Sequence, residues 1–172
     1  MNSSNAESHG QEQKVKEEHF LVSKTDLKSH ITYINQEFCQ VTGYKISELI
    51  GQNHAIFRCS LVPHGIYNLL WEHLKAEEEF FGYIANQNKD GSHYWSFINV
   101  TPYYENDEIC GYFAVQRMPT KEALDIIKPL YQEMCKIEKD ADPALLLPLS
   151  SAALWQAITK EYQSYAEFIL SL

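Results

Sequence analysis

The chain has 172 residues, of which 45% are hydrophobic and 13% aromatic, so it can build the core of about one ordinary domain with extensions. Its formal net charge of -9 argues against a nucleic-acid-binding surface, which needs a basic stripe, and against docking on anionic lipid. No run approaches about 18 uninterrupted apolar residues, and the polar N-terminus lacks the apolar stretch of a secretory signal, so we expect no membrane insertion.

The first third of the chain alternates short strands with short helices. Residues 1–18 are polar and lack aromatic side chains, so we expect disorder there. Alternating apolar residues predict strands over 19–26 and 30–35. Helical spacing of apolar residues predicts a helix over 36–42, and the stretch 47–51 is typical of a single helical turn.

A longer helix and three strands should follow. An apolar stripe at helical spacing, opened by a proline, predicts a helix over 63–76. The strand-like runs 80–87 and 92–103 flank the turn sequence NKDG at 88–91, and Asp-Gly between two such runs is a strong hairpin signal. A third strand is expected over 109–118. This order of elements indicates an α+β domain.

The last 50 or so residues return to helical spacing. We expect one helix over 121–138 and a second over 150–172, separated by a short linker. In the second helix, residues at alternating spacings of three and four resemble a coiled-coil seam: Trp155, Ile158, Tyr162, Tyr165, Ile169 and Leu172. The seam could serve dimerisation or a partner, or it could fold back on the sheet.

The chemistry-bearing residues do not form an enzyme motif. The chain has no paired-carboxylate motif, nucleophile elbow, HExxH or P-loop, so we expect a protein that is not an enzyme. Its four cysteines are scattered and form no CxxC pair, which indicates free thiols in a reducing cytoplasm and no metal site. The histidines follow no heme motif, so heme is not favoured.

Four segments carry a family resemblance: GYKISELIGQ at 43–52, NKDGSHYW at 88–95, TPYY at 101–104 and GYFAVQRMPT at 111–120. They resemble the signature segments of PAS domains. Over about 20–136 the chain is most similar to the FAD-binding PAS domain of bacterial aerotaxis receptors. The resemblance implies a PAS fold with a five-stranded antiparallel sheet, short helices on one face and a C-terminal helical extension.

The domain boundaries that follow are a disordered tail over 1–18, a PAS sensor domain over 19–120 and C-terminal helices over 121–172. The resemblance also implies FAD bound without a covalent link and read out as a redox or oxygen signal. Positions at or near the flavin pocket are Asn35, Asn53, His54, Arg58, Trp71, Phe80, Asn86 and Ser96.

Three of these residues have plausible chemical roles. Arg58 could hold the pyrophosphate as a bidentate cation. Asn86 could form hydrogen bonds at the isoalloxazine edge, with Ser96 doing the same from the next strand. Each residue also has a structural alternative: Asn35 and Asn86 could satisfy turns or strand ends, Arg58 could be an exposed charge, and Trp71 could fill the core.

The sequence departs from the family in the cofactor region. The family's His-Pro-Asp-Met-Pro segment is Cys-Ser-Leu-Val-Pro at 59–63, and Phe80 stands where the family has tryptophan. The cysteine of blue-light flavin PAS domains corresponds to His54, so we expect no cysteinyl-flavin chemistry.

We therefore expect a cytoplasmic signal-transduction sensor that passes a redox or oxygen signal through its C-terminal helices to a signalling partner or to a second copy in a homodimer. The alternative is a PAS module that binds another small ligand, or none, and serves dimerisation or protein–protein interaction.

Overall fold

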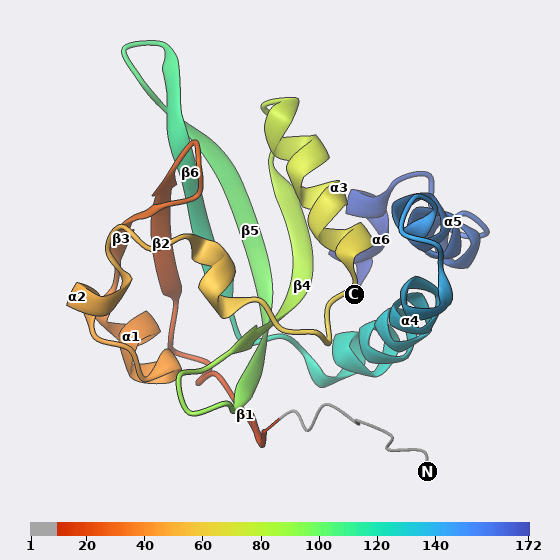
Figure 1. Ribbon diagram of the computed structural model, residues 1–172, viewed down its shortest axis with the longest axis horizontal. Helices are drawn as coiled ribbons and strands as arrows, with labels where there is room; N and C mark the ends of the chain where they lie inside the picture. The colour runs from red at the N-terminus through yellow and green to blue at the C-terminus, as the bar shows by residue number, and fades with distance from the viewer. Residues whose placement is uncertain (1–9) are drawn as a thin grey trace.

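The computed structural model describes residues 10–172 as a curved sheet with helices along one face and at one edge (Figure 1). The strands are β1 (Glu12–Gln13), β2 (Leu21–Asp26), β3 (Ile31–Ile34), β4 (Phe80–Gln87), β5 (His93–Glu105) and β6 (Glu108–Arg117). The helices are α1 (Gln36–Thr42), α2 (Ile46–Leu49), the 3-10 helix η1 (His54–Phe57), α3 (His64–Lys75), α4 (Lys121–Asp140), α5 (Leu146–Ile158) and α6 (Tyr165–Ser171).

Five of the strands form the expected antiparallel sheet, in the order β4-β5-β6-β2-β3. The β4–β5 hairpin turns at the predicted Asp-Gly, where Gly91 has a φ of 84°. The β5–β6 hairpin turns at Asn106 and Asp107, which both have positive φ, as a two-residue turn between twisted strands requires. The predicted strands and helices between residues 19 and 118 are thus confirmed.

The sheet has a sixth strand that the sequence analysis did not predict. Strand β1 pairs in parallel with the start of β5, Glu12 lying opposite His93. Val15, just after it, is only 1% exposed. The expected disorder is therefore wrong for residues 10–18, because the backbone of β1 pairs with β5 and the Val15 side chain is buried in the core. Residues 1–9 lie outside the described part of the chain.

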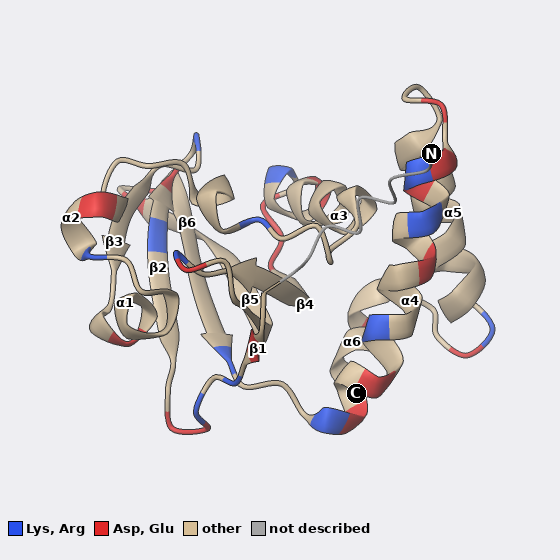
Figure 2. Ribbon diagram, turned by 60° about the horizontal axis from the view of Figure 1, so that its bottom comes forward, with Lys and Arg blue, Asp and Glu red and all other residues tan. Residues whose placement is uncertain are grey.

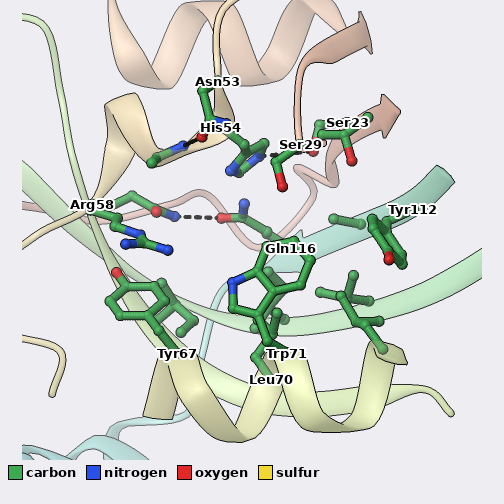
Figure 3. Close-up of a pocket in the computed structure, with 18 residues that line it drawn as sticks. Ser23, Ser29, Asn53, His54, Arg58, Tyr67, Leu70, Trp71, Tyr112 and Gln116 are labelled. Atoms are coloured by element: carbon green, nitrogen blue, oxygen red, sulfur yellow. Dashed lines mark hydrogen bonds between the residues drawn. The ribbon is translucent and has the colours of Figure 1, made fainter. Parts of the chain in front are cut away.

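Two apolar clusters fix the helices to the sheet. The smaller one joins α1, α2 and η1 to β2 and β3 and is centred on Phe38, Leu49 and Phe57, each fully buried. The larger one joins α3 to β4, β5 and the C-terminal helices. Helices α3 and η1 lie over the same face of the sheet (Figure 1), and a cavity lies between them and the strands (Figure 3).

The C-terminal region differs from its prediction. Helix α4 matches the expected helix over 121–138, but the expected single helix over 150–172 is two helices, because Ser164 caps the start of α6 after a turn. The supposed seam is not one face: Trp155 is 36% exposed, whereas Ile158 and Ile169 are 2% and 1% exposed. Helices α5 and α6 fold back against α3 and β4 (Figure 1).

Charged residues of both signs are interspersed over the described elements, and they alternate along α4 (Figure 2). Within residues 10–172, no helix combines the length and apolar character needed to cross a bilayer.

Candidate ligand-binding cavity

A cavity lies between the concave face of the sheet and helices η1 and α3 (Figure 3). Its volume is about 100 Å³, whereas one water molecule needs about 10–15 Å³ on the same measure. The lining side chains are Ser23, Thr25, Ser29, Asn53, His54, Ala55, Arg58, Tyr67, Leu70, Trp71, Leu74, Ile84, Asn86, Ile98, Val100, Tyr112, Ala114 and Gln116. Strand alternation explains which strand residues line the cavity, since every second residue of β2, β4, β5 and β6 faces inward.

A buried polar cluster lies on the sheet side of the cavity, which two of its members, Asn86 and Gln116, line. The side-chain oxygen of Gln116 on β6 accepts hydrogen bonds from Asn86 Nδ2 at 2.9 Å and from Ser96 Oγ at 2.9 Å. Tyr94 donates a longer bond of 3.3 Å to the same oxygen. Burial raises the pKa of Tyr94 above its ordinary value, so this hydroxyl remains a donor at neutral pH. The cluster ties β4, β5 and β6 together through one atom.

The same glutamine has an unused donor. Gln116 is fully buried, and its Nε2 has no hydrogen-bond partner among the described residues. Gln116 also lines the cavity. A buried amide without a partner is costly, because it has lost its hydration without replacement. The arrangement therefore suits a molecule in the cavity that presents an acceptor, such as a carbonyl oxygen or a ring nitrogen.

Aromatic and cationic groups form the wall on the helix side. The Arg58 guanidinium lies 4.6 Å from the centre of the Tyr67 ring. Arg58 itself is exposed, so its charge is at the mouth of the cavity. Trp71 packs edge-on against Tyr112 with ring centres 5.6 Å apart. The cavity thus combines flat apolar walls, buried amides and one cation at its opening.

His54 lies on the opposite wall, contributed by η1. Its Nε2 is 3.1 Å from Ser23 Oγ, and its ring packs against Phe57 with centres 5.2 Å apart. Burial lowers the pKa of His54 to about 4, and the positive charge of Arg58 adds to the effect. The imidazole is therefore neutral at pH 7 and can donate or accept a hydrogen bond without adding charge to the cavity.

The sequence comparison decides the family. The family model of the PAS domain matches residues 17–117, which is more than half of the chain. The chain belongs to the PAS domain family. The fold is similar to that of a light-oxygen-voltage (LOV) domain of a blue-light-activated histidine kinase from Erythrobacter litoralis, which is 26% identical, with a TM-score of 0.52, over 58% of this chain and 94% of that one.

Other relatives are sensory or regulatory proteins by name. The aerotaxis receptor of Escherichia coli is 37% identical over 66% of this chain and 22% of its own length, and the nitrogen fixation regulatory protein of Klebsiella pneumoniae is 35% identical over 60% of this chain and 21% of its own. A LOV domain studied with a flavin analogue has the same fold, with 21% identity and a TM-score of 0.56 over 66% of this chain and 86% of that one. This chain thus spans about a fifth of the length of the curated relatives.

The PAS cavity brings together five of the eight site residues expected from the sequence: Asn53, His54, Arg58, Trp71 and Asn86. Ser96 lies directly behind the lining and reaches it through Gln116. Asn53 has a structural task as well, since it caps η1 through the backbone N–H of Ala55.

Asn35 and Phe80 are not among the lining residues. Asn35 caps α1 and binds the backbone of β2, accepting from Val22 N–H and donating to the Phe20 carbonyl. The Asn35 amide therefore binds backbone groups at a helix start and a strand end, which is the structural alternative given for it above. Phe80 stacks on Tyr165 with ring centres 5.6 Å apart, so it belongs to the contact between β4 and α6.

Sequence reasoning missed several lining residues, including Ser23, Thr25, Tyr67 and Gln116. A signal for two of them exists in the strand sequence LVSKTD, where small polar residues occupy alternate positions of one face. The inward face of a buried strand is normally apolar, so two hydroxyls there indicate a polar cavity.

Proposed function

We propose that this PAS domain is a cytoplasmic sensor that binds a flavin, with FAD the first choice, and reports its redox state through the C-terminal helices without catalytic turnover. The observation that carries the proposal is the unpartnered Nε2 of Gln116 in a cavity with flat aromatic walls. A flavin ring is planar and presents carbonyl oxygens and ring nitrogens along one edge, which such donors can bind. When bound, a flavin supplies reversible one- and two-electron redox chemistry.

The residues of this chain would hold such a group in a defined way. Trp71 and Tyr67 would contact the faces and edges of the ring, and Gln116 and Asn86 would bind its polar edge. Arg58 at the mouth would hold a phosphate outside the cavity. The amides of Asn86 on β4 and Gln116 on β6 would exchange hydrogen-bond partners if the acceptors at that edge changed with redox state, and this exchange would shift the strands that carry them.

Similarity to a receptor and to a regulatory protein supports the proposal. The relatives are an aerotaxis receptor and a nitrogen fixation regulatory protein, and one fold neighbour is a LOV domain studied with a flavin analogue. The output would reach a signalling partner or a second copy of the chain through surfaces of the C-terminal helices.

The test is the visible absorption spectrum of the purified protein, with and without added FAD, before and after dithionite. A two-band yellow spectrum that bleaches on reduction supports the proposal; a protein that stays colourless after incubation with FAD overturns it. Ala114 lines the cavity and is 8% exposed. Ala114→Leu should fill the space and abolish flavin retention, whereas Ala152→Leu, at an exposed position of α5, should leave it unchanged.

A second candidate has its own observation. The cavity volume of about 100 Å³ favours a ligand smaller than a whole flavin unless the α3 wall moves outward. In that case the PAS domain would bind a small planar metabolite, or none, and act as an interaction module. This second candidate would be favoured if a small ligand slowed hydrogen exchange in the cavity strands and FAD did not.

A further inference from the structure

A buried carboxylate connects three helices that the sequence alone does not link. Glu138 on α4 has a side chain that is only 5% exposed. It accepts hydrogen bonds from the backbone N–H groups of His64 and Gly65, both at 2.9 Å, and from Ser150 Oγ at 2.6 Å. His64 Nδ1 also lies 2.9 Å from the carboxylate. We call these four residues the Glu138 clasp.

The clasp supplies the hydrogen-bond acceptor that the first N–H groups of α3 lack. The first N–H groups of a helix have no partner within the helix, and Pro63, which precedes α3, offers no side chain to cap them. Glu138 takes that place from more than 70 residues away, where its negative charge also suits the positive end of the helix. Burial raises the pKa of Glu138, but the hydrogen bonds from Ser150, Gly65 and His64 outweigh it and lower the pKa, so the carboxylate is ionised at pH 7.

Close packing reinforces the clasp. A Cβ atom on Gly65 would collide with Ser150 Oγ and would lie 2.9 Å from Ser150 Cβ. Helices α3 and α5 can therefore approach this closely only with glycine at 65. The contact holds α5 in place, and α6 follows it along the edge strand β4.

Helix α3 also forms the wall of the cavity. Over the turns that follow the clasp, it contributes Tyr67, Leu70, Trp71 and Leu74 to the lining. A packed helix moves as a unit, so a displacement of the cavity side must also displace the N–H groups that bind Glu138. The clasp is thus the contact at which a movement of the cavity wall reaches the C-terminal helices.

We propose that the Glu138 clasp couples the cavity to the docking of α5 and α6, so that a change in the cavity wall loosens or tightens these helices. The identity of the cavity's ligand rests on the proposed function, but the coupling itself is a property of the chain. Because coupling is reciprocal, breaking the clasp should also change the affinity for whatever molecule the cavity binds.

The test compares variants of the full chain by hydrogen exchange over residues 146–171. Glu138→Gln keeps the shape of the side chain, but the amide can no longer accept all the hydrogen bonds that the carboxylate accepts. It should speed hydrogen exchange in 146–171 by about tenfold or more. Ser150→Ala, a milder change, should act in the same direction. Glu133→Gln is the matched control, because Glu133 lies on the same helix with a side chain that is 62% exposed. Exchange that rises equally throughout the chain, or not at all in 146–171, overturns the proposal.

A double-mutant cycle tests the coupling without any ligand. Trp71→Ala removes part of the cavity wall and should speed exchange in 146–171 when Glu138 is present. It should add little once Glu138→Gln has broken the clasp. If the two effects simply multiply, or if Trp71→Ala has no effect on α5 and α6, the coupling does not exist. Failure to bind FAD would leave this cycle interpretable, so the two proposals can fail separately.

Discussion

Asn86 on β4 donates a 2.9 Å hydrogen bond to Gln116 on β6, across the central strand that separates them. Ser96 on that central strand donates to the same oxygen. One carbonyl oxygen therefore gathers donors from two strands while belonging to a third. Such a cluster makes the sheet sensitive to any molecule that competes for these amides, and it makes Gln116 important for stability as well.

The first prediction concerns this oxygen. Gln116→Leu removes the closest acceptor of the buried donors Asn86 and Ser96 and leaves each only a longer hydrogen bond, so we expect the free energy of unfolding to fall by about 2 kcal/mol or more. Urea denaturation measures the change. Gln87→Leu, at the exposed end of β4, should change it by less than about 0.5 kcal/mol. Equal effects of the two substitutions would contradict a special role for Gln116.

The hairpins and most strands could be predicted because their signals are local. Asp90-Gly91 specifies a turn through the backbone freedom of glycine, and alternating residues specify strands whatever they pack against. Five of the eight expected site residues line the cavity for a related reason: strand alternation and the positions of short helices are shared by the family, so a matching residue is carried to a matching place.

The failures of prediction involve contacts between distant segments. Phe80 packs on Tyr165, which lies beyond the segment on which the resemblance rested, so nothing local could show that it turns away from the cavity. Strand β1 is two residues long, too short for any periodic signal. The spacing over 155–172 predicted an apolar contact but not what it is made with, because spacing alone cannot distinguish a partner from the domain itself.

The second prediction concerns pH. The pKa of His54 is about 4 in the folded protein, below its ordinary value, because burial disfavours the charged ring. The fold therefore favours the neutral form, and its contribution to stability is complete above about pH 6.5 and is lost progressively as the pH falls toward 4. Ring-proton NMR should show His54 still neutral at pH 5.5. His54→Gln should flatten the loss of stability between pH 6.5 and 4. A ring that titrates near 6.5 would rule this out.

The third prediction tests whether Arg58 binds the phosphate of a flavin or its ring. Arg58 and Arg117 both lie over aromatic rings, at 4.6 Å from Tyr67 and 4.8 Å from Phe97, but only Arg58 lines the cavity. If flavin binds, Arg58→Ala should weaken FAD by about tenfold, the loss of a charge-assisted hydrogen bond, and should affect riboflavin, which has no phosphate, much less. Arg117→Ala is the control and should leave both affinities unchanged, as measured by fluorescence quenching. A similar loss for riboflavin would instead assign Arg58 to the ring.

The fourth prediction tests the docking of the C-terminal helices with two neighbouring residues. Ile169 is 1% exposed against the core, whereas Leu170 is 59% exposed. Ile169→Ala leaves a cavity in the contact between α6 and β4 and should cost about 2–4 kcal/mol. Leu170→Ala removes the same kind of side chain from solvent and should cost less than about 0.5 kcal/mol. Urea denaturation, read together with hydrogen exchange over 165–171, gives both values. If α6 instead docked on a partner through an exposed face, Leu170→Ala would have the larger effect on association and Ile169→Ala would leave the isolated chain as stable as before.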